Sequence, residues 1–434
     1  MKQPSTLSPR GAVAARTPLR ADFDLFNEVM QNEYDAVKNP EGAIPLCIAE
    51  NLLGWNSLRE KLREIGSQKA CPDWVASYTD TLGHPDLRAA LASFLSQELG
   101  GDALDPECLA VSAGATAVIE MTSFLLASPD DYAVIPGPAY GGYTPDIQFK
   151  SDLQRYDLQL ADSVDHPGVY NLTIKDLDRA YADLSEQFKL LILTHPNNPT
   201  GQVFTEDQIF AAVTWCEERR IHCVVNEIYA LSLIDQDHPE LSADYEDRQW
   251  FVSCLSQLEQ RKSDYFHWWY SFSKDFGISG LRVGALYTKN EQLITAYRNY
   301  GAPSTTSNYT QWLLSELLPQ TDWIRQWMQT ERNLTPSYLI VIKALRELQI
   351  DYVPAVGSLF VWFDLSKFLT EDTDDAWVEL WKDIYGKTGL LLTYPVGMGS
   401  DQRGWFRMVF TGVPPATLRE AMRRFTYYCR AKQV

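Results

Sequence analysis

The sequence predicts an α/β protein that has a large domain, with a mainly parallel sheet flanked by helices, and a smaller α+β domain. Strand-like and helix-like runs alternate from about residue 109 to residue 297, which is typical of a parallel sheet covered by helices. A helical pattern at 323–348 then leads into a strand-like run at 356–363. We assign this second region to the smaller domain and expect the N-terminal segment to complete it.

We divide the chain where this pattern changes. Residues 1–20 hold Lys and Arg with Pro and Ala but no apolar signal core, so we expect a flexible N-terminal arm; a transit peptide is the less favoured alternative. The small domain is discontinuous and comprises residues 21–50 and 320–434. Residues 51–319 form the large domain, in which the charged stretch at 235–264 is expected at the surface.

The first two strand-like runs of the large domain end in turns with distinctive chemistry. One ends in SAGAT (112–116), a small-residue turn that opens a helical pattern at 117–127. Such a turn gathers backbone N–H groups at a helix N-terminus and favours an anion there. The other ends in PGPAYGGY (136–143), a rigid turn that can hold Tyr140 against a flat ring. Taken alone, the first turn is weak evidence, because such turns end many strands, and Tyr140 alone is better explained as a core aromatic.

The next two strand-like runs also carry polar residues at their carboxyl ends. HPNNPTG (195–201) predicts a turn that points the Asn198 amide inward; an Asn that only bonds its own turn is the alternative. CVVNEIY (223–229) is typical of a buried strand that ends in polar groups. Parallel α/β sheets bind ligands at these carboxyl ends, so the four turns predict one site.

The most informative segment is SFSKDFG (271–277), followed by GLRVG (280–284). It sets Lys274 beside two serine hydroxyls, those of Ser271 and Ser273, and places an arginine eight residues further on. A deprotonated lysine amine forms a Schiff base with an aldehyde, and a phosphate on that aldehyde needs donors and positive charge nearby. The segment is therefore equipped to hold a phosphorylated aldehyde covalently, whereas the alternative is a surface turn with a solvated lysine.

Together these motifs resemble those of the fold-type I pyridoxal 5′-phosphate (PLP) enzymes, the class I/II aminotransferase superfamily with the aspartate aminotransferase-like fold. Within that superfamily they are similar to the 1-aminocyclopropane-1-carboxylate (ACC) synthase-like branch. The resemblance extends from about residue 23 to the C-terminus and includes AEN (49–51) and WFRMVF (405–410). It implies that the large domain binds PLP and that the active sites lie at a homodimer interface.

The resemblance also implies roles for individual residues. Lys274 is implied as the catalytic residue, which forms the Schiff base with PLP and moves the Cα proton. Arg407 is implied to clamp the substrate α-carboxylate with its planar guanidinium, although an Arg in a strand is alternatively a structural ion-pair partner. Glu50 is implied near the substrate amine or sulfonium, with a turn carboxylate as an equal alternative. The implied cofactor contacts are Ala115, Thr116, Tyr140, Asn198, Asn226, Tyr229, Ser271, Ser273 and Arg282.

Two positions depart from the family pattern. Asn226 stands where most of the superfamily has Asp; an amide can hydrogen-bond the pyridine nitrogen but cannot pair with its positive charge. We expect a weaker electron sink, and we expect Glu227 to face the opposite side of the strand. Thr81 stands where related enzymes place a Tyr that reaches the partner subunit's phosphate, and Tyr78 is the candidate replacement.

Composition narrows the class of protein. The net charge of −19 opposes nonspecific nucleic-acid binding, and no apolar run reaches the ~20 residues that cross a bilayer. Seven cysteines without a CxxC pair predict reduced thiols and a cytoplasmic setting. The six histidines show no metal-binding spacing, so we expect no catalytic metal.

We therefore expect a PLP-dependent enzyme that acts on an α-amino acid through a Schiff base with its amine, the external aldimine. The proposed reaction is γ-elimination or γ-replacement on S-adenosylmethionine or a related γ-substituted amino acid. An aminotransferase that yields a 2-oxo acid is the alternative. A noncatalytic PLP-binding protein is less favoured, because Lys274 is present.

Overall fold

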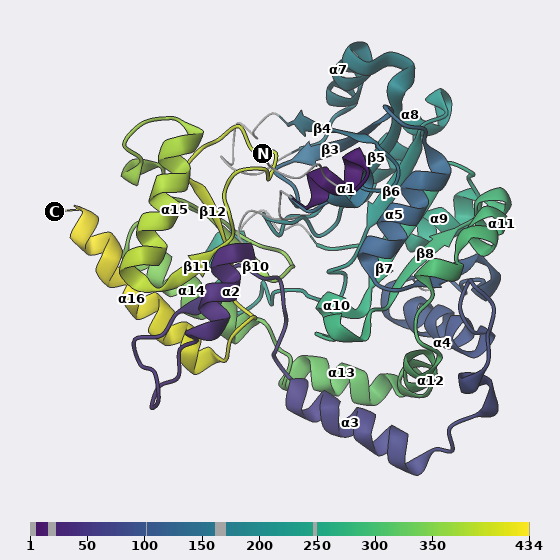
Figure 1. Cartoon of the computed structure of the whole chain (residues 1–434), viewed down its shortest axis with the longest axis horizontal. Coiled ribbons are helices and arrows are strands. Elements are labelled where there is room, and N and C mark those ends of the chain that lie inside the picture. Colours follow the sequence, from purple (N-terminus) through teal and green to yellow (C-terminus); the bar gives the residue numbers. More distant parts are fainter. Residues whose placement is uncertain (1–5, 16–22, 101, 161–170, 246–249, 434) are drawn as a thin grey trace.

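A computed structural model describes residues 6–15, 23–100, 102–160, 171–245 and 250–433, and its elements fall into a larger and a smaller group (Figure 1). The larger group surrounds a seven-stranded sheet of the described chain, whose strand order is β2-β8-β7-β6-β5-β3-β4. All neighbouring strands are parallel except at β8, which runs antiparallel to both β2 and β7. The strands are β2 (Leu109–Ser112), β3 (Tyr132–Gly137), β4 (Gln154–Gln159), β5 (Phe188–Thr194), β6 (His222–Asn226), β7 (Phe266–Ser271) and β8 (Gly284–Thr288).

Successive side chains along these strands point to opposite faces of the sheet, and both faces are buried. On β6, Cys223 and Val225 belong to one core cluster and Val224 to another, as the two-residue period of a strand requires. Each face is thereby covered, which is typical of a parallel sheet. The helices of this group are α3 (Trp55–Gln68), α4 (Pro85–Leu95), α5 (Ala115–Leu126), α6 (Tyr143–Gln148), α7 (Ile174–Leu184), α8 (Glu206–Arg219), α9 (Leu255–Arg261), α10 (Phe272–Asp275), α11 (Glu291–Tyr300), α12 (Asn308–Leu317) and α13 (Thr321–Thr330).

The smaller group contains a three-stranded antiparallel sheet, β12-β10-β9, and the parallel pair β1-β11, counted over the described residues. Segments from both ends of the chain share its core, so the sheet pair joins residues far apart in sequence. This architecture confirms the predicted fold class. Its elements are β1 (Ile44–Leu46), β9 (Tyr352–Val353), β10 (Phe360–Asp364), β11 (Leu390–Leu392), β12 (Trp405–Val409), α2 (Phe23–Gln31), α14 (Thr335–Glu347), α15 (Asp374–Thr388) and α16 (Pro415–Gln433).

Three details differ from the sequence-based expectations. The single helical pattern at 323–348 is two helices, α13 and α14, because Pro336 fits only the first turn of a helix; buried Arg332 between them donates to the backbone of the large group. Ile324 and Trp327 pack in the core of the large sheet, so the boundary expected at residue 320 falls after α13. The strand expected from residue 356 begins only at Phe360, after Ser358 adopts a positive φ of 84°.

The N-terminal arm also differs in part from the expectation of a flexible segment. Residues 1–5 and 16–20 lie outside the described residues. Between them lies a short helix, α1 (Pro9–Ala14), and its Arg10 forms an ion pair with Asp152 at 2.8 Å. Within the described ranges, no helix combines the length and apolar character needed to cross a membrane.

Candidate active site

The predicted turns meet at one edge of the large sheet because of its strand directions. The carboxyl ends of β2, β3, β5, β6 and β7 share this edge. Antiparallel β8 begins there, with Gly284 paired to both Ser112 and Ser271. Arg282, two residues before β8, is thereby brought beside the turn that carries Lys274. The topology therefore gathers residues from positions 112 to 284 around one point.

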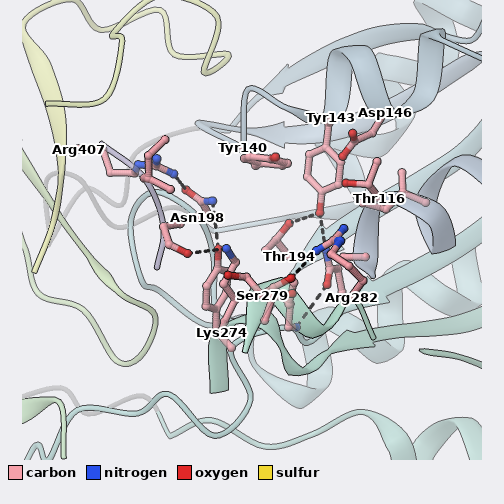
Figure 2. Close-up of a pocket in the computed structure, with 18 residues that line it drawn as sticks. Thr116, Tyr140, Tyr143, Asp146, Thr194, Asn198, Lys274, Ser279, Arg282 and Arg407 are labelled. Carbon is pink, nitrogen blue, oxygen red and sulfur yellow. Dashed lines mark hydrogen bonds between the residues drawn. The ribbon is translucent and has the colours of Figure 1, made fainter. Parts of the chain in front are cut away.

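A cavity of about 160 Å³ lies at this edge (Figure 2). Ten of the twelve candidate site residues line it; Ser271 and Glu50 do not. The side chains labelled in Figure 2 point into a common space from both groups of elements. The lining candidates are Ala115, Thr116, Tyr140, Asn198, Asn226, Tyr229, Ser273, Lys274, Arg282 and Arg407.

One end of the cavity, which we call the Arg282 end, is formed by Gly114, Ala115, Thr116, Ser273, Ser279 and Arg282. Gly114 has a φ of 92° and precedes the first residue of α5, which has no side-chain cap. A Cβ at Gly114 would collide with the Arg282 guanidinium, so only glycine allows this approach. Backbone N–H groups of a helix start and a guanidinium together form an anion site.

Lys274 lies in the middle of the cavity on the short helix α10. Its Nζ donates to the carbonyl oxygen of Ala49 at 2.6 Å. In return, the Asn51 side-chain amide donates to the carbonyl of Lys274 at 3.2 Å. The AEN segment thus docks against the lysine turn, although it is Ala49, not Glu50, that meets the amine.

The lysine turn is held from behind by a buried ion pair. Asp275 and Arg332 approach to 3.6 Å, and Asp275 accepts from the Ser232 hydroxyl at 2.6 Å and from the Tyr270 hydroxyl at 3.0 Å. Burial raises the pKa of Asp275 to about 6, against the opposing effect of the Arg332 charge. The partners satisfy the buried carboxylate and so fix the residue next to Lys274.

Another part of the wall, which we call the Asn226 end, is formed by Asn226, Tyr143, Thr194 and Asp146. Asn226 Nδ2 donates to the Tyr143 hydroxyl at 2.8 Å, and that hydroxyl lies 2.7 Å from Thr194 Oγ1. Burial raises the pKa of Tyr143 to about 12, so its phenol is neutral at ordinary pH. The ring of Tyr140 meets that of Tyr143 edge-on, with centroids 5.4 Å apart.

Glu227 faces away from the cavity, which confirms the expectation from strand alternation. Its carboxylate accepts from the Ser253 hydroxyl at 2.5 Å, from the Cys254 backbone N–H at 2.7 Å and from the Trp268 indole at 2.8 Å. Asn226 is therefore the member of this pair whose side chain reaches the cavity.

Arg407 enters the cavity from the smaller group, on the central part of β12. Its three guanidinium nitrogens donate to Thr393 Oγ1 at 2.9 Å, Asn198 Oδ1 at 2.8 Å and the Cys47 carbonyl at 2.9 Å. Asn198 Nδ2 in turn lies 3.3 Å from the Tyr229 hydroxyl, whose pKa is raised by burial. These contacts fix the orientation of the planar group, as a two-pronged carboxylate clamp requires.

Two candidates lie outside the lining. The Ser271 hydroxyl bonds the Val283 carbonyl at 2.8 Å and caps α10 through the Ser273 N–H at 3.2 Å, so it orients the lysine helix without reaching the cavity. Glu50 is exposed, and its backbone carbonyl is held by Thr411 Oγ1 at 2.7 Å. Thr81, which departs from the family pattern, donates to the Arg298 carbonyl at 2.5 Å. Tyr78, its candidate replacement, is fully exposed.

Four polar lining residues were not identified from the sequence: Tyr143, Asp146, Thr194 and Ser279. A signal existed for two of them. Tyr143 stands three residues after Tyr140 in the PGPAYGGY turn, and Thr194 is the last residue of a strand that ends at the site. Asp146 follows Tyr143 by one helical turn, a relation visible only once α6 is known to begin at Tyr143.

The chain is similar to known proteins over most of its length. The sequence profile described as "Aminotransferase class I and II" matches residues 41–425, which is most of the chain. The chain belongs to this family. It is a PLP-dependent enzyme, as the predicted cofactor and family require.

Relatives of this chain include ACC synthases of plants. ACC synthase 1 from Prunus mume is 28% identical over 423 residues, covering 94% of this chain and 82% of that protein. ACC synthase 7 from Arabidopsis thaliana is 28% identical over 421 residues, covering 94% and 91%. A double mutant of Thermus thermophilus aspartate aminotransferase has a TM-score of 0.76 at 20% identity, covering 98% of this chain and all of that one, which shows the shared fold.

The residues that line the cavity of this enzyme fit PLP. At the Arg282 end, Gly114 has no Cβ and so leaves room for a phosphate. The Arg282 guanidinium beside it supplies positive charge. Tyr140 lines the cavity beside Tyr143 (Figure 2). Lys274 supplies an amine in the same cavity, and the side-chain amide of Asn226, which has both a donor and an acceptor, can hydrogen-bond a ring nitrogen.

Proposed function

We propose that this enzyme eliminates or replaces the γ-substituent of S-adenosylmethionine or of a related γ-substituted amino acid. The observation that carries the proposal is the similarity to ACC synthases over 94% of the chain. The cavity supports an α-amino acid as substrate, because Lys274 and Arg407 line the same small space. A carboxylate held by Arg407 would place the neighbouring amine and Cα toward Lys274.

The chain's own residues would act as follows. Arg407 binds the α-carboxylate with two parallel N–H donors, and Asn198 keeps the guanidinium in position through the 2.8 Å bond to its Oδ1. Bound PLP supplies a ring that withdraws electrons from Cα. Lys274 Nζ accepts the proton from Cα and returns it at a later step. The buried walls of the cavity exclude water from that proton transfer.

We assign the part of the substrate beyond Cγ to the mouth of the cavity. Glu50 is exposed next to Ala49, which does line the cavity, so its carboxylate can face a positively charged sulfonium from the cavity mouth. We also propose that the enzyme is a homodimer, in which exposed Tyr78 contacts the neighbouring site. Such an arrangement would use the surface around Tyr78 and Thr81 in both copies.

The proposed reaction is tested by incubating the PLP-loaded enzyme with S-adenosylmethionine and measuring methylthioadenosine. We expect release with the unmodified enzyme and none with Lys274→Ala, because only the former can move the Cα proton. An absence of methylthioadenosine, together with 2-oxo acids formed from common amino acids, would identify an aminotransferase instead. No turnover of either kind would indicate a noncatalytic PLP-binding protein.

A further inference from the structure

Asp146 is a buried carboxyl group in the wall of the cavity that the proposed reaction does not use. It lies one helical turn after Tyr143 on α6 and is only 7% exposed. Within the described part of the chain, its buried Oδ2 has no hydrogen-bond partner. Figure 2 shows the Asp146 side chain beside the ring of Tyr143 and close to Thr116, at the side of the pocket away from Arg407. A buried carboxyl without partners is costly and calls for an explanation.

The position of Asp146 relates it to the substitution at residue 226. The superfamily pattern expects a carboxylate at position 226, and this chain has an amide there. Asn226 donates to the Tyr143 hydroxyl at 2.8 Å, and the charge of Asp146 acts on that same hydroxyl. Burial is the main cause of the raised Tyr143 pKa, and ionised Asp146 raises it further. The negative charge of Asp146 therefore acts on groups at the Asn226 end.

We propose that Asp146 supplies the negative charge that Asn226 lacks, and that it tunes the protonation of the PLP ring nitrogen from the cavity wall. In this role its ionised form favours a protonated ring nitrogen, whereas its neutral form does not. The inference concerns the bound cofactor and is independent of the γ-substituted substrate proposed above. Asp146 is in this sense a charge-tuning residue and not a proton carrier at Cα.

The ionisable groups around Asp146 set the pH at which this effect appears. Burial raises the pKa of Asp146 to about 7, and the negative charge of Glu120 on α5 adds to the rise. The Lys150 ammonium lies 3.8 Å from Glu120 and offsets part of its charge. On β4, which also packs against α6, Arg155 is engaged with Asp157 at 2.7 Å. Asp146 therefore gains its charge near neutral pH, where an enzyme of this kind works.

The test uses PLP labelled with nitrogen-15 in the ring and bound to the resting enzyme, without substrate. At about pH 8, above the pKa of Asp146, we expect Asp146→Asn to lower the ring-nitrogen pKa by about one, because a buried negative charge in the cavity wall favours the protonated ring. The nitrogen-15 shift should move toward that of an unprotonated pyridine. Asp183→Asn, at an exposed site on α7, should leave the shift unchanged.

A second variant keeps Asp146 in place. Glu120→Gln should lower the pKa of Asp146, so the pH transition of the bound PLP absorbance should move to lower pH without disappearing. An unchanged nitrogen-15 shift in Asp146→Asn would overturn the proposal. If that variant failed to retain PLP, an unmoved transition in Glu120→Gln would overturn it instead. Because neither measurement needs a substrate, the result is separate from that of the methylthioadenosine assay.

Discussion

The two ends of the cavity are assembled from different kinds of structure. At the Arg282 end, the groups come from short motifs and from backbone: a glycine turn, a helix start and an arginine that touches the glycine. At the Asn226 end, Tyr143, Thr194 and Asn226 come from three separate elements and meet only through hydrogen bonds across the fold. A phosphate can be bound by almost any such helix start, whereas the charge near a ring nitrogen depends on the particular side chains around it. The first end thus depends on local motifs, and the second on side chains that the tertiary fold brings together.

The largest test of this contrast removes the lysine that shares the cavity with both ends. Lys274→Ala should lower turnover by at least about a thousandfold, because the group that moves the Cα proton is lost. PLP should remain bound without a covalent link, since the Arg282 end is intact. Turnover and bound PLP absorbance measure the two effects separately, and Lys175→Ala, an exposed lysine on α7, is the control. A loss of PLP from Lys274→Ala would show that the Arg282 end does not hold the cofactor by itself.

A smaller effect is expected from a change at the Arg282 end. In Gly114→Ala, the new methyl group would meet the Arg282 guanidinium at a backbone φ of 92°. The methyl group displaces the guanidinium from its place beside the helix start, and losing a charge-assisted hydrogen bond costs about 1.5–3 kcal/mol, so PLP should bind about tenfold to a hundredfold more weakly. Equilibrium dialysis of PLP measures the affinity. Gly386→Ala, where nothing lies within 4 Å of a Cβ and the residue is in α15, is the matched control and should bind PLP normally.

The same comparison explains which features could be predicted from the sequence. The strands, the SAGAT turn and the SFSKDFG segment are local patterns, and the structure places them where they were expected. Asp146 could not be identified, because its importance depends on burial by α5 and on its place beside Tyr143. Ser271 and Glu50 were assigned by motif alone. The Ser271 hydroxyl caps α10, and the Glu50 side chain faces solvent. Arg332 likewise lies between two helices where the sequence predicted one, and its hydrogen bond to the lysine turn depends on the tertiary fold.

The smallest effect is expected at the Asn226 end. Tyr143→Phe removes the hydroxyl between Asn226 and Thr194, and leaving a buried donor unpaired costs about 1–2 kcal/mol of the free energy of unfolding. Its affinity for PLP should stay within a few-fold of normal, because the Arg282 end is untouched. Urea unfolding of the apoenzyme measures the first quantity, and PLP titration the second. A large loss of PLP affinity would show that the two ends do not act independently.

The central claim is that this cavity holds PLP through Lys274. Borohydride reduction of the PLP-loaded enzyme makes the Schiff base permanent, and peptide mapping by mass spectrometry then locates the pyridoxyl group. We expect the label on the peptide that contains SFSKDFG, at Lys274. A label on a different lysine, with Lys274 unmodified, would contradict the assignment of the cavity and every role derived from it.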